Sequence, residues 1–356
     1  MKRGFVFTIH SVAGLLSGLF ILIMSLSGAA LVFRDELNRL EYPPEILRAN
    51  SPVIAIDSCY NNLKKEFPGA EVSSCRLAPN NRLSFLFTIY DSSYKNGREA
   101  LKVFVQPQNG SIQKTEGADV SFVNRLGRLH SSLFLGKKGE WLLGFFSVVF
   151  LISILTGLVQ YRRNAWAVLS FRKKFFRRGN LHQCIGVWAL IFNLMIGITG
   201  FWMQRYVFKK EFYGTTSYTQ VLKSSPSLFF PLDSSLMNLK MKYPGFTPHV
   251  IYFAQSKKGS TAIYGSRSSN SFIHSKDFAD AIFLDSSGLV SFTAFVNEVD
   301  ASNRYDIINA QVHYGQYGGL PVKIIYFVFG LTGGLLSITG FLLWLKRRRS
   351  KIRVAA

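Results

Sequence analysis

The chain has 356 residues, a formal net charge of +22, 48% apolar residues and 15% aromatic residues, among them 32 phenylalanines. Charged residues make up only 17%, against roughly 25% in ordinary soluble domains, which argues against a plain soluble enzyme and against a disordered tail. Three cysteines without a Cys-x-x-Cys pair exclude a disulfide-rich scaffold and a zinc site built on that motif.

Four long apolar runs predict a membrane protein with four transmembrane helices. The runs cover residues 5–33, 141–160, 184–203 and 322–345, and none contains Asp or Glu. Each has about 20 residues or more, enough at about 1.5 Å per residue to cross a hydrocarbon core of roughly 30 Å. The first run is much longer than the apolar region of a signal peptide, so we expect it to remain as a span rather than to be cleaved.

The basic residues indicate the orientation of these spans. Fifteen Lys and Arg residues, with no acidic residue among them, lie in segments 1–9, 161–181 and 346–356. With four spans these segments share one side of the membrane, and the positive-inside rule places that side in the cytoplasm. Because most of the excess charge is explained by topology, we expect no nucleic-acid partner.

Two segments of about one small domain each then face outward, and both predict a helix followed by four strands. The first has a helix at 55–67, a Pro-Gly stop, and strands at 71–77, 83–90, 101–106 and 111–114. The second has a helix at 232–243, a Pro-Gly stop, and strands at 249–255, 260–264, 281–285 and 289–292. The predicted fold class is a membrane α-helical protein: a four-span bundle with two outer α+β domains, arranged as two parallel halves.

The predicted boundaries follow from these patterns. Spans occupy 1–33, 136–161, 182–206 and 321–346; outer domains occupy 34–135 and 207–320; basic cytoplasmic segments occupy 162–181 and 347–356. Cys59 and Cys75, in the first outer helix and the strand after it, could form a disulfide or remain two buried thiols, and the sequence leaves both open. Cys184 lies within the third span, where we expect it to serve packing.

Four of the six histidines lie at the ends of spans and repeat in register. His10, Gly14, Ser27 and Gly28 are matched, 172 residues later, by His182, Gly186, Thr199 and Gly200. His130, Gly136, Thr156 and Gly157 are matched, 183 residues later, by His313, Gly319, Thr339 and Gly340. The chain is therefore two parallel halves, each consisting of a span, an outer domain and a second span.

This spacing pairs the histidines by depth. His10 and His182 lie near the inner surface, whereas His130 and His313 lie just outside the second and fourth spans. A single histidine at a membrane boundary is usually only an interfacial polar residue, but duplicated positions at matching depth favour a function. Two facing imidazoles in a helical bundle are an axial ligand set for haem iron, although imidazole also suits copper, zinc or iron without a porphyrin.

The glycines of the repeat predict space beside these ligands. Gly14 and Gly186 follow the inner histidines by one helical turn and would leave room for a flat ligand. Gly28 and Gly200 follow them by 18 residues, five turns of about 3.6 residues, so they share the histidine's face at the depth of the outer pair. The alternative role for these glycines is helix–helix packing, which is common in membranes.

The same residues resemble the PepSY-associated transmembrane proteins. The likeness is carried by the segments IHSVAG (9–14), SGAALVFRDEL (27–37), LHSSLFLG (129–136), LHQCIGVW (181–188) and HYGQYGG (313–319). The Pro-Gly stops FPG (67–69) and YPG (243–245) resemble those of PepSY modules. The family includes iron-regulated inner-membrane proteins and di-haem reductases of ferric siderophores.

The resemblance implies a multi-pass protein of the bacterial inner membrane, in contact with lipid, with both termini cytoplasmic. It implies two haem b groups, held by His10 with His182 and by His130 with His313, and electron transfer to a periplasmic ferric chelate such as a siderophore. No Gly-x-Gly-x-x-Gly fingerprint follows a strand, so we expect a quinol or a separate reductase as electron donor. The alternatives are a membrane-anchored PepSY-type binding or regulatory protein without redox activity, and a permease, which the expected unbroken spans argue against.

The topology can be tested directly. Reporter fusions at Ala356 should be active in the cytoplasm, and fusions near Asp91 should be active outside it, because the basic segments lack acidic partners. A C-terminus on the same side as Asp91 would contradict the four-span arrangement.

Overall fold

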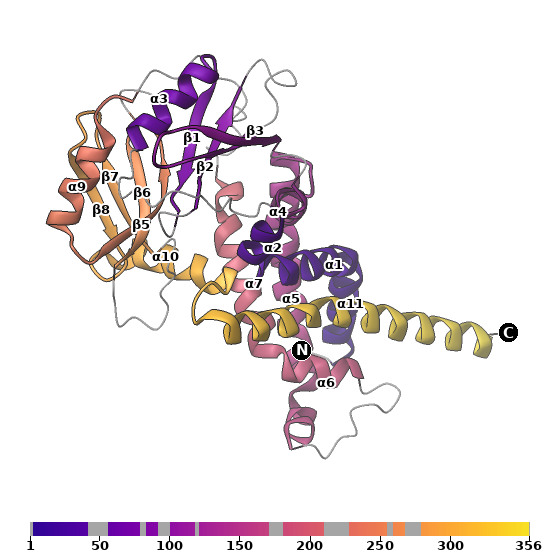
Figure 1. Cartoon of the computed structure of the whole chain (residues 1–356). Helices are drawn as coiled ribbons and strands as arrows, with labels where there is room; N and C mark the ends of the chain where they lie inside the picture. Colours follow the sequence, from indigo (N-terminus) through magenta and orange to yellow (C-terminus); the bar gives the residue numbers. More distant parts are fainter. Residues whose placement is uncertain are drawn as a thin grey trace. The chain divides into compact units, whose positions relative to one another are not determined.

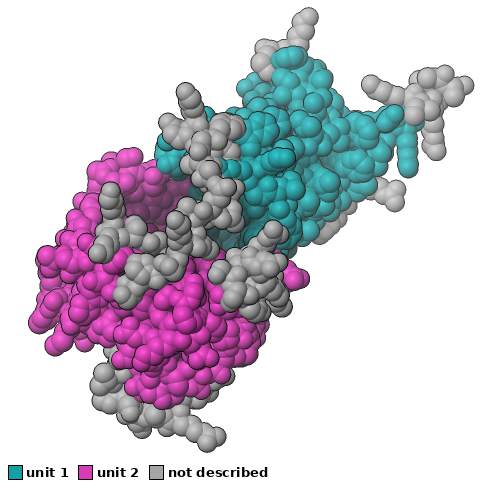
Figure 2. All heavy atoms as spheres, turned by 90° about the horizontal axis from the view of Figure 1, so that it is seen from above, with its two compact units in different colours: residues 1–34, 126–215, 312–356 teal, residues 35–125, 216–311 magenta. Residues whose placement is uncertain are grey.

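The computed structural model describes residues 3–41, 56–78, 83–91, 100–117, 121–170, 181–209, 228–254, 259–267 and 279–355. They form two compact units, shown in different colours in Figure 2. The membrane unit comprises residues 1–34, 126–215 and 312–356, and the sheet unit comprises residues 35–125 and 216–311.

Three helices of the membrane unit are long and apolar enough to span a bilayer (Figure 1). They are α1 (Arg3–Leu31), α5 (Lys137–Leu169) and α11 (Gly319–Ala355). Their apolar stretches are Gly4–Leu31, Lys137–Arg163 and Gly319–Ser350, in agreement with the first, second and fourth predicted spans. The chain is therefore a multi-pass membrane protein with three or four spans.

The third predicted span is bent, which the sequence analysis did not expect. Helix α6 (Leu181–Trp188) and helix α7 (Leu190–Gln204), continued by the 3₁₀ turn η3 (Arg205–Phe208), meet at an angle of 63°. At the bend Ala189 leaves the helical conformation, and its carbonyl accepts both the backbone N–H of Asn193, at 2.8 Å, and the side-chain amide of Asn193, at 3.0 Å. The prediction of an unbroken helix was wrong here. The argument against a permease that rested on unbroken spans therefore no longer holds.

The sheet unit contains the predicted helices and strands. Its first half holds α3 (Ile56–Glu66), β1 (Glu71–Arg76), β2 (Phe85–Tyr90), β3 (Ala100–Val105) and β4 (Ile112–Gly117). Its second half holds α9 (Leu232–Lys242), β5 (Phe246–Tyr252), β6 (Thr261–Arg267), β7 (Asp280–Leu284) and β8 (Val290–Phe295). Three further helices, α2 (Arg34–Glu41), α4 (Phe122–Ser132) and α10 (Ala301–Tyr314), adjoin these elements in sequence.

The two predicted outer domains are halves of a single antiparallel sheet with the order β4-β3-β2-β1-β5-β6-β7-β8. The halves join where β1 pairs with β5, with Cys75 opposite Ile251. Pairing these strands removes two open sheet edges, which would otherwise be prone to non-specific pairing. The expectation of two separate domains is thus replaced by one unit with one continuous core.

This core lies between one face of the sheet and helices α3 and α9. Alternate strand residues point into it, so that Phe85, Phe87, Ile251 and Ile263 are almost fully buried. Cys59 and Cys75 belong to the same core and are free thiols. Burial raises the pKa of Cys59 to about 12 and raises that of Cys75 as well, so both thiols stay protonated and unreactive.

Two aspartates link the N-termini of α3 and α9 reciprocally. Asp233 of α9 accepts the backbone N–H groups of Ile56 and Asp57, and Asp57 of α3 accepts those of Leu232 and Asp233, all at 2.8–3.0 Å. Each carboxylate therefore caps the helix of the other half, where the helix dipole favours negative charge. Burial and the nearby charge of Asp57 raise the pKa of Asp233, so its protonation favours the folded state as the pH falls.

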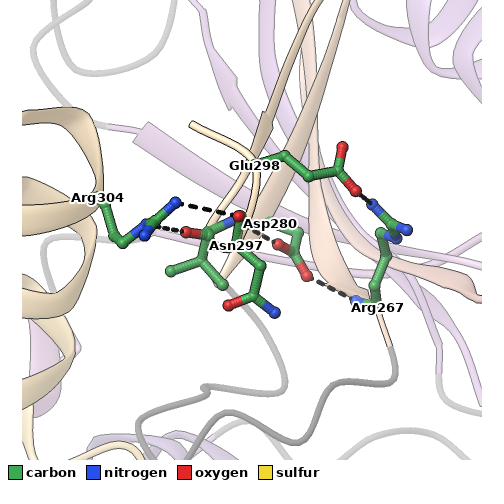
Figure 3. A network of polar contacts seen from close by, with 6 residues as sticks. Arg267, Asp280, Asn297, Glu298 and Arg304 are labelled. Atoms are coloured by element: carbon green, nitrogen blue, oxygen red, sulfur yellow. Dashed lines mark hydrogen bonds and ion pairs between the residues drawn. The ribbon is translucent and has the colours of Figure 1, made fainter. Parts of the chain in front are cut away.

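A second polar network fixes the turn that follows β8 (Figure 3). The buried Asp280 accepts the backbone N–H groups of Arg267 and Val296, at 2.7 and 2.9 Å. Arg304 of α10 donates to the carbonyls of Val296, Asn297 and Val299, each at 3.0 Å. These bonds set the point at which the chain leaves the sheet and enters α10.

The reciprocal caps predict a measurable stability loss. Asp57→Ala and Asp233→Ala should each lower the free energy of unfolding of the sheet unit by about 1–2 kcal/mol, because each leaves two helix N–H groups without their acceptor. Pulse proteolysis of the full chain across a urea gradient measures this loss. Glu66→Ala, which removes an exposed carboxylate at the other end of α3, should be nearly neutral, and equal effects of all three variants would contradict the capping role.

Candidate functional site

The four repeated histidines come together as two pairs within the membrane unit. His10 of α1 faces His182 of α6 with their ring centroids 6.2 Å apart, and His130 of α4 faces His313 of α10 at 6.4 Å. All four side chains are partly buried. Each pair thus consists of one histidine from each half of the chain.

Each imidazole packs directly on a glycine of a neighbouring helix. A Cβ atom added at Gly28 or Gly157 would lie 2.8 or 2.9 Å from an imidazole Cε1 atom, too close unless the ring moves, and one added at Gly200 or Gly340 would lie 3.1 or 3.3 Å away, a tight contact. The contacts join His130 to Gly28, His10 to Gly157, His313 to Gly200 and His182 to Gly340. At Gly28 and Gly157 the missing side chain is what lets the ring approach the helix backbone so closely.

The Nδ1 atom of each imidazole is held by a hydrogen bond to the same neighbouring helix. His130 bonds Ser27 at 2.9 Å, His313 bonds Thr199 at 3.0 Å and His182 bonds Thr339 at 2.9 Å. His10 bonds the carbonyl of Ser153 at 2.9 Å, and the hydroxyl of Thr156 lies 3.4 Å from the same nitrogen. A glycine and a hydrogen bond together leave each ring little rotational freedom.

The structure places the predicted glycines in two different roles. Gly28 and Gly200 lie against the outer histidines. Five unbroken turns of α1 separate His10 from Gly28, whereas the bend at Ala189 lies between His182 and Gly200. Gly14 and Gly186 do not contact an imidazole closely; an added Cβ would meet Ser153 of α5 or Leu336 of α11 at 3.7 Å. These are ordinary van der Waals distances, so the packing around Gly14 and Gly186 would admit a small side chain.

The inner histidines use two glycines that the sequence analysis had not assigned to the site. Gly157 and Gly340 take the position that Gly14 and Gly186 were expected to fill. Both were part of the 183-residue repeat, and each follows a threonine in the same way as Gly200 does. The repeat of a hydroxyl residue followed by glycine was the signal that could have revealed them.

The outer histidines are positioned by contacts at the ends of their helices. Glu41 caps the first turn of α4 by accepting the backbone N–H of Phe122, at 2.6 Å, and the hydroxyl of Ser121, at 2.8 Å. At the end of α10 the Tyr326 hydroxyl donates to the carbonyl of Val312, the residue before His313, at 2.7 Å. Gly315 follows with a φ of 63°, which lets the chain turn tightly over the Tyr326 ring.

The outer pair is neutral at ordinary pH. Burial, together with the neighbouring His313, lowers the pKa of His130 to about 3, and burial lowers the pKa of His313 to about 4. Neutral imidazole is the form that binds metals.

Two aromatic contacts between helices of the membrane unit follow the same repeat. Phe20 and Phe146 stack with their centroids 4.6 Å apart, and Phe192 and Phe329 pack at 5.6 Å. Phe192 follows Phe20 by 172 residues and Phe329 follows Phe146 by 183, the offsets of the histidines. In sequence, Phe20 lies about midway between His10 and Gly28, and so about midway along α1 between the two sites.

Comparison with known families accounts for this repeated arrangement. The sequence model of the PepSY-associated TM region matches residues 7–347, nearly the whole chain, with all four histidines inside the match. The chain belongs to this family. No curated protein sequence matches the chain closely enough to count as a relative.

Each histidine pair of this PepSY-associated protein could supply two imidazole ligands to one metal-containing group. Metal–imidazole bonds of about 2.0 Å on opposite sides of one metal would place the ring centroids about 6.3 Å apart. The observed separations are 6.2 and 6.4 Å. Among the described residues no group of three or more His, Cys, Asp or Glu could hold a metal ion.

Proposed function

We propose that this PepSY-associated protein binds two haem b groups and transfers electrons across the membrane to a ferric chelate outside it. The observation that carries the proposal is the pair of facing imidazoles at each of two depths, with centroid separations of 6.2 and 6.4 Å. Membrane anchors need no buried histidines, and duplicated ones in matching positions favour a function.

Within this proposal the bacterial inner membrane holds the chain, with both termini in the cytoplasm. The support is the set of 15 basic residues in segments 1–9, 161–181 and 346–356, which contain no acidic residue. His10 and His182 then lie toward the cytoplasmic leaflet, and His130 and His313 toward the outer one.

The residues of the chain hold the groups and protect them from water. His10 with His182 would bind one haem and His130 with His313 the other, which would supply one-electron redox chemistry at each position. The four glycines let the imidazoles lie against helix backbones, and the hydrogen bonds at Nδ1 keep the opposite ring nitrogen directed at the ligand site. The two sites are separated along α1 by the 18 residues from His10 to Gly28, about 27 Å of helix.

The proposed substrate is a ferric siderophore or another ferric chelate, bound on the outer side. Its reduction to the ferrous state would weaken chelation by hard oxygen donors and release the iron for uptake. The support is the resemblance of the sequence to a family that includes ferric-siderophore reductases. The proposed electron donor is a quinol or a separate reductase.

A protein that only binds a ligand or regulates a partner is the alternative. Both possibilities would use the sheet unit, but only electron transfer requires the histidine pairs. The two are therefore separated by whether the purified chain carries haem in a stoichiometry set by those residues.

Single substitutions test the pairing. His10→Ala and His182→Ala should each remove one haem and leave the other, while His130→Ala and His313→Ala should remove the second, because each iron needs both of its axial ligands. Pyridine haemochrome assays give the haem content of each variant, and His249→Ala, outside the membrane unit, should retain both. Loss of the same haem in His10→Ala and His130→Ala would contradict the pairing.

The glycines provide a test of selectivity with an internal control. Gly200→Leu should displace His313 and shift or abolish only the outer haem, whereas Gly340→Leu should displace His182 and affect only the inner one. Both substitutions overpack the bundle, at a cost of about 1–3 kcal/mol, so a general loss of stability is shared by the two. Redox titration shows which of two potentials moves. If both variants affected both haems equally, the glycines would serve only helix packing.

A further inference from the structure

A hydroxyl residue precedes each glycine on which a histidine packs. The four dipeptides are Ser27-Gly28, Thr156-Gly157, Thr199-Gly200 and Thr339-Gly340, one on each of α1, α5, α7 and α11. The hydroxyl and the glycine meet the same imidazole, the glycine at Cε1 and the hydroxyl at Nδ1. The same arrangement therefore occurs four times in the membrane unit.

The proton of each hydroxyl is already committed. Each one donates to the carbonyl of the residue four positions earlier in its own helix, at 2.7–2.8 Å. A hydroxyl has one proton and two lone pairs, so an oxygen that donates to its own helix can only accept from a second partner. The hydrogen bond to the imidazole is therefore donated by the imidazole, and the proton lies on Nδ1.

His10 reaches the same state through a different acceptor. Its Nδ1 lies 2.9 Å from the carbonyl oxygen of Ser153, and a carbonyl cannot donate, so this nitrogen must carry the proton. The Thr156 hydroxyl, 3.4 Å away, stands beside this bond. In its neutral form each of the four histidines then carries its proton on Nδ1 and a lone pair on Nε2.

We propose that Ser27, Thr199 and Thr339 are positioning residues that hold His130, His313 and His182 in the Nδ1–H tautomer, and that the carbonyl of Ser153 does the same for His10, so that Nε2 is presented as a metal ligand. A hydrogen bond donated by a ligating histidine fixes its ring and raises its basicity. The part of this inference that concerns haem rests on the proposed function, whereas the tautomer is a property of the chain itself.

Two matched substitutions separate the hydroxyl from the volume of the side chain. Thr199→Val keeps nearly the same shape but removes the acceptor for His313, and Thr199→Ser keeps the acceptor. Thr332→Val is the control, because Thr332 lies in α11 and bonds Asn193 rather than a histidine. Any effect that Thr332→Val and Thr199→Val have in common is a general effect of losing a hydroxyl in the bundle.

The first measurement needs no haem. In the full chain labelled with ¹⁵N-histidine and produced without haem, the signals of His313, assigned by their loss in His313→Ala, should show one tautomer with the proton on Nδ1. Thr199→Val should convert this to a mixture of tautomers, and Thr199→Ser and Thr332→Val should not. A mixture or the Nε2–H tautomer in the unsubstituted chain would overturn the proposal.

The second measurement uses the haem-loaded chain. Thr199→Val should weaken binding of the outer haem by about 10–100-fold, the usual cost of losing a partner of a metal ligand. It should also raise the potential of that haem, because a less basic imidazole stabilises ferric iron less, while the inner haem keeps its potential. Recovery of affinity and potential in Thr199→Ser supports the role, and equal effects of Val and Ser would overturn it. If the unsubstituted chain shows the Nδ1–H tautomer yet binds no haem, the proposed function fails while the positioning role stands.

Discussion

The contact between an imidazole and a bare helix backbone is the constraint on which the membrane unit depends. Gly28 and Gly157 leave no room for a methyl group beside His130 and His10, and in the second half Gly200 and Gly340 make similar but looser contacts with His313 and His182. The contacts connect α4 to α1, α1 to α5, α10 to α7 and α6 to α11. The same residues that orient the histidines therefore also fix how the helices of the bundle pack, so ligand geometry and helix packing cannot be changed separately.

Duplication organises both units of the chain in the same way, by letting each half complete the other. In the membrane unit every histidine pair takes one residue from each half. In the sheet unit β1 pairs with β5, and Asp57 and Asp233 each cap the helix of the opposite half. Neither half forms its sheet core or its histidine pairs alone. Corresponding positions of the two halves have compatible chemistry: serine or threonine before glycine, and phenylalanine between the histidine positions in sequence.

The sequence predicted those features that depend on local pattern or on the repeat. Apolar runs located the spans, alternation and Pro-Gly stops located the strands, and a constant offset paired His10 with His182. It could not predict features set by distant residues. The pairing of β1 with β5 and the capping by Asp57 and Asp233 join residues about 175 positions apart, and no local pattern encodes them. The bend at Ala189 lies within a continuous apolar run, and hydropathy does not indicate whether such a run is straight or bent.

The inner glycines show a different limit. Gly14 and Gly186 were predicted to flank the inner histidines because residues one turn apart share a helix face. The contacting glycines, Gly157 and Gly340, instead come from the neighbouring helix. The prediction treated the helix of each histidine alone, whereas the site is built between helices. The prediction for the outer histidines did not have this weakness, because Gly28 and Gly200 were already placed on different helices from His130 and His313.

The most direct test of the account is the haem content and spectrum of the purified, unsubstituted chain from haem-replete cells. Two imidazole pairs, with ring centroids 6.2 and 6.4 Å apart, predict two haem b groups per chain, both reducible and both low-spin with two histidine ligands. A colourless protein, or one whose haem content is unchanged when His182 and His313 are both replaced, would contradict it.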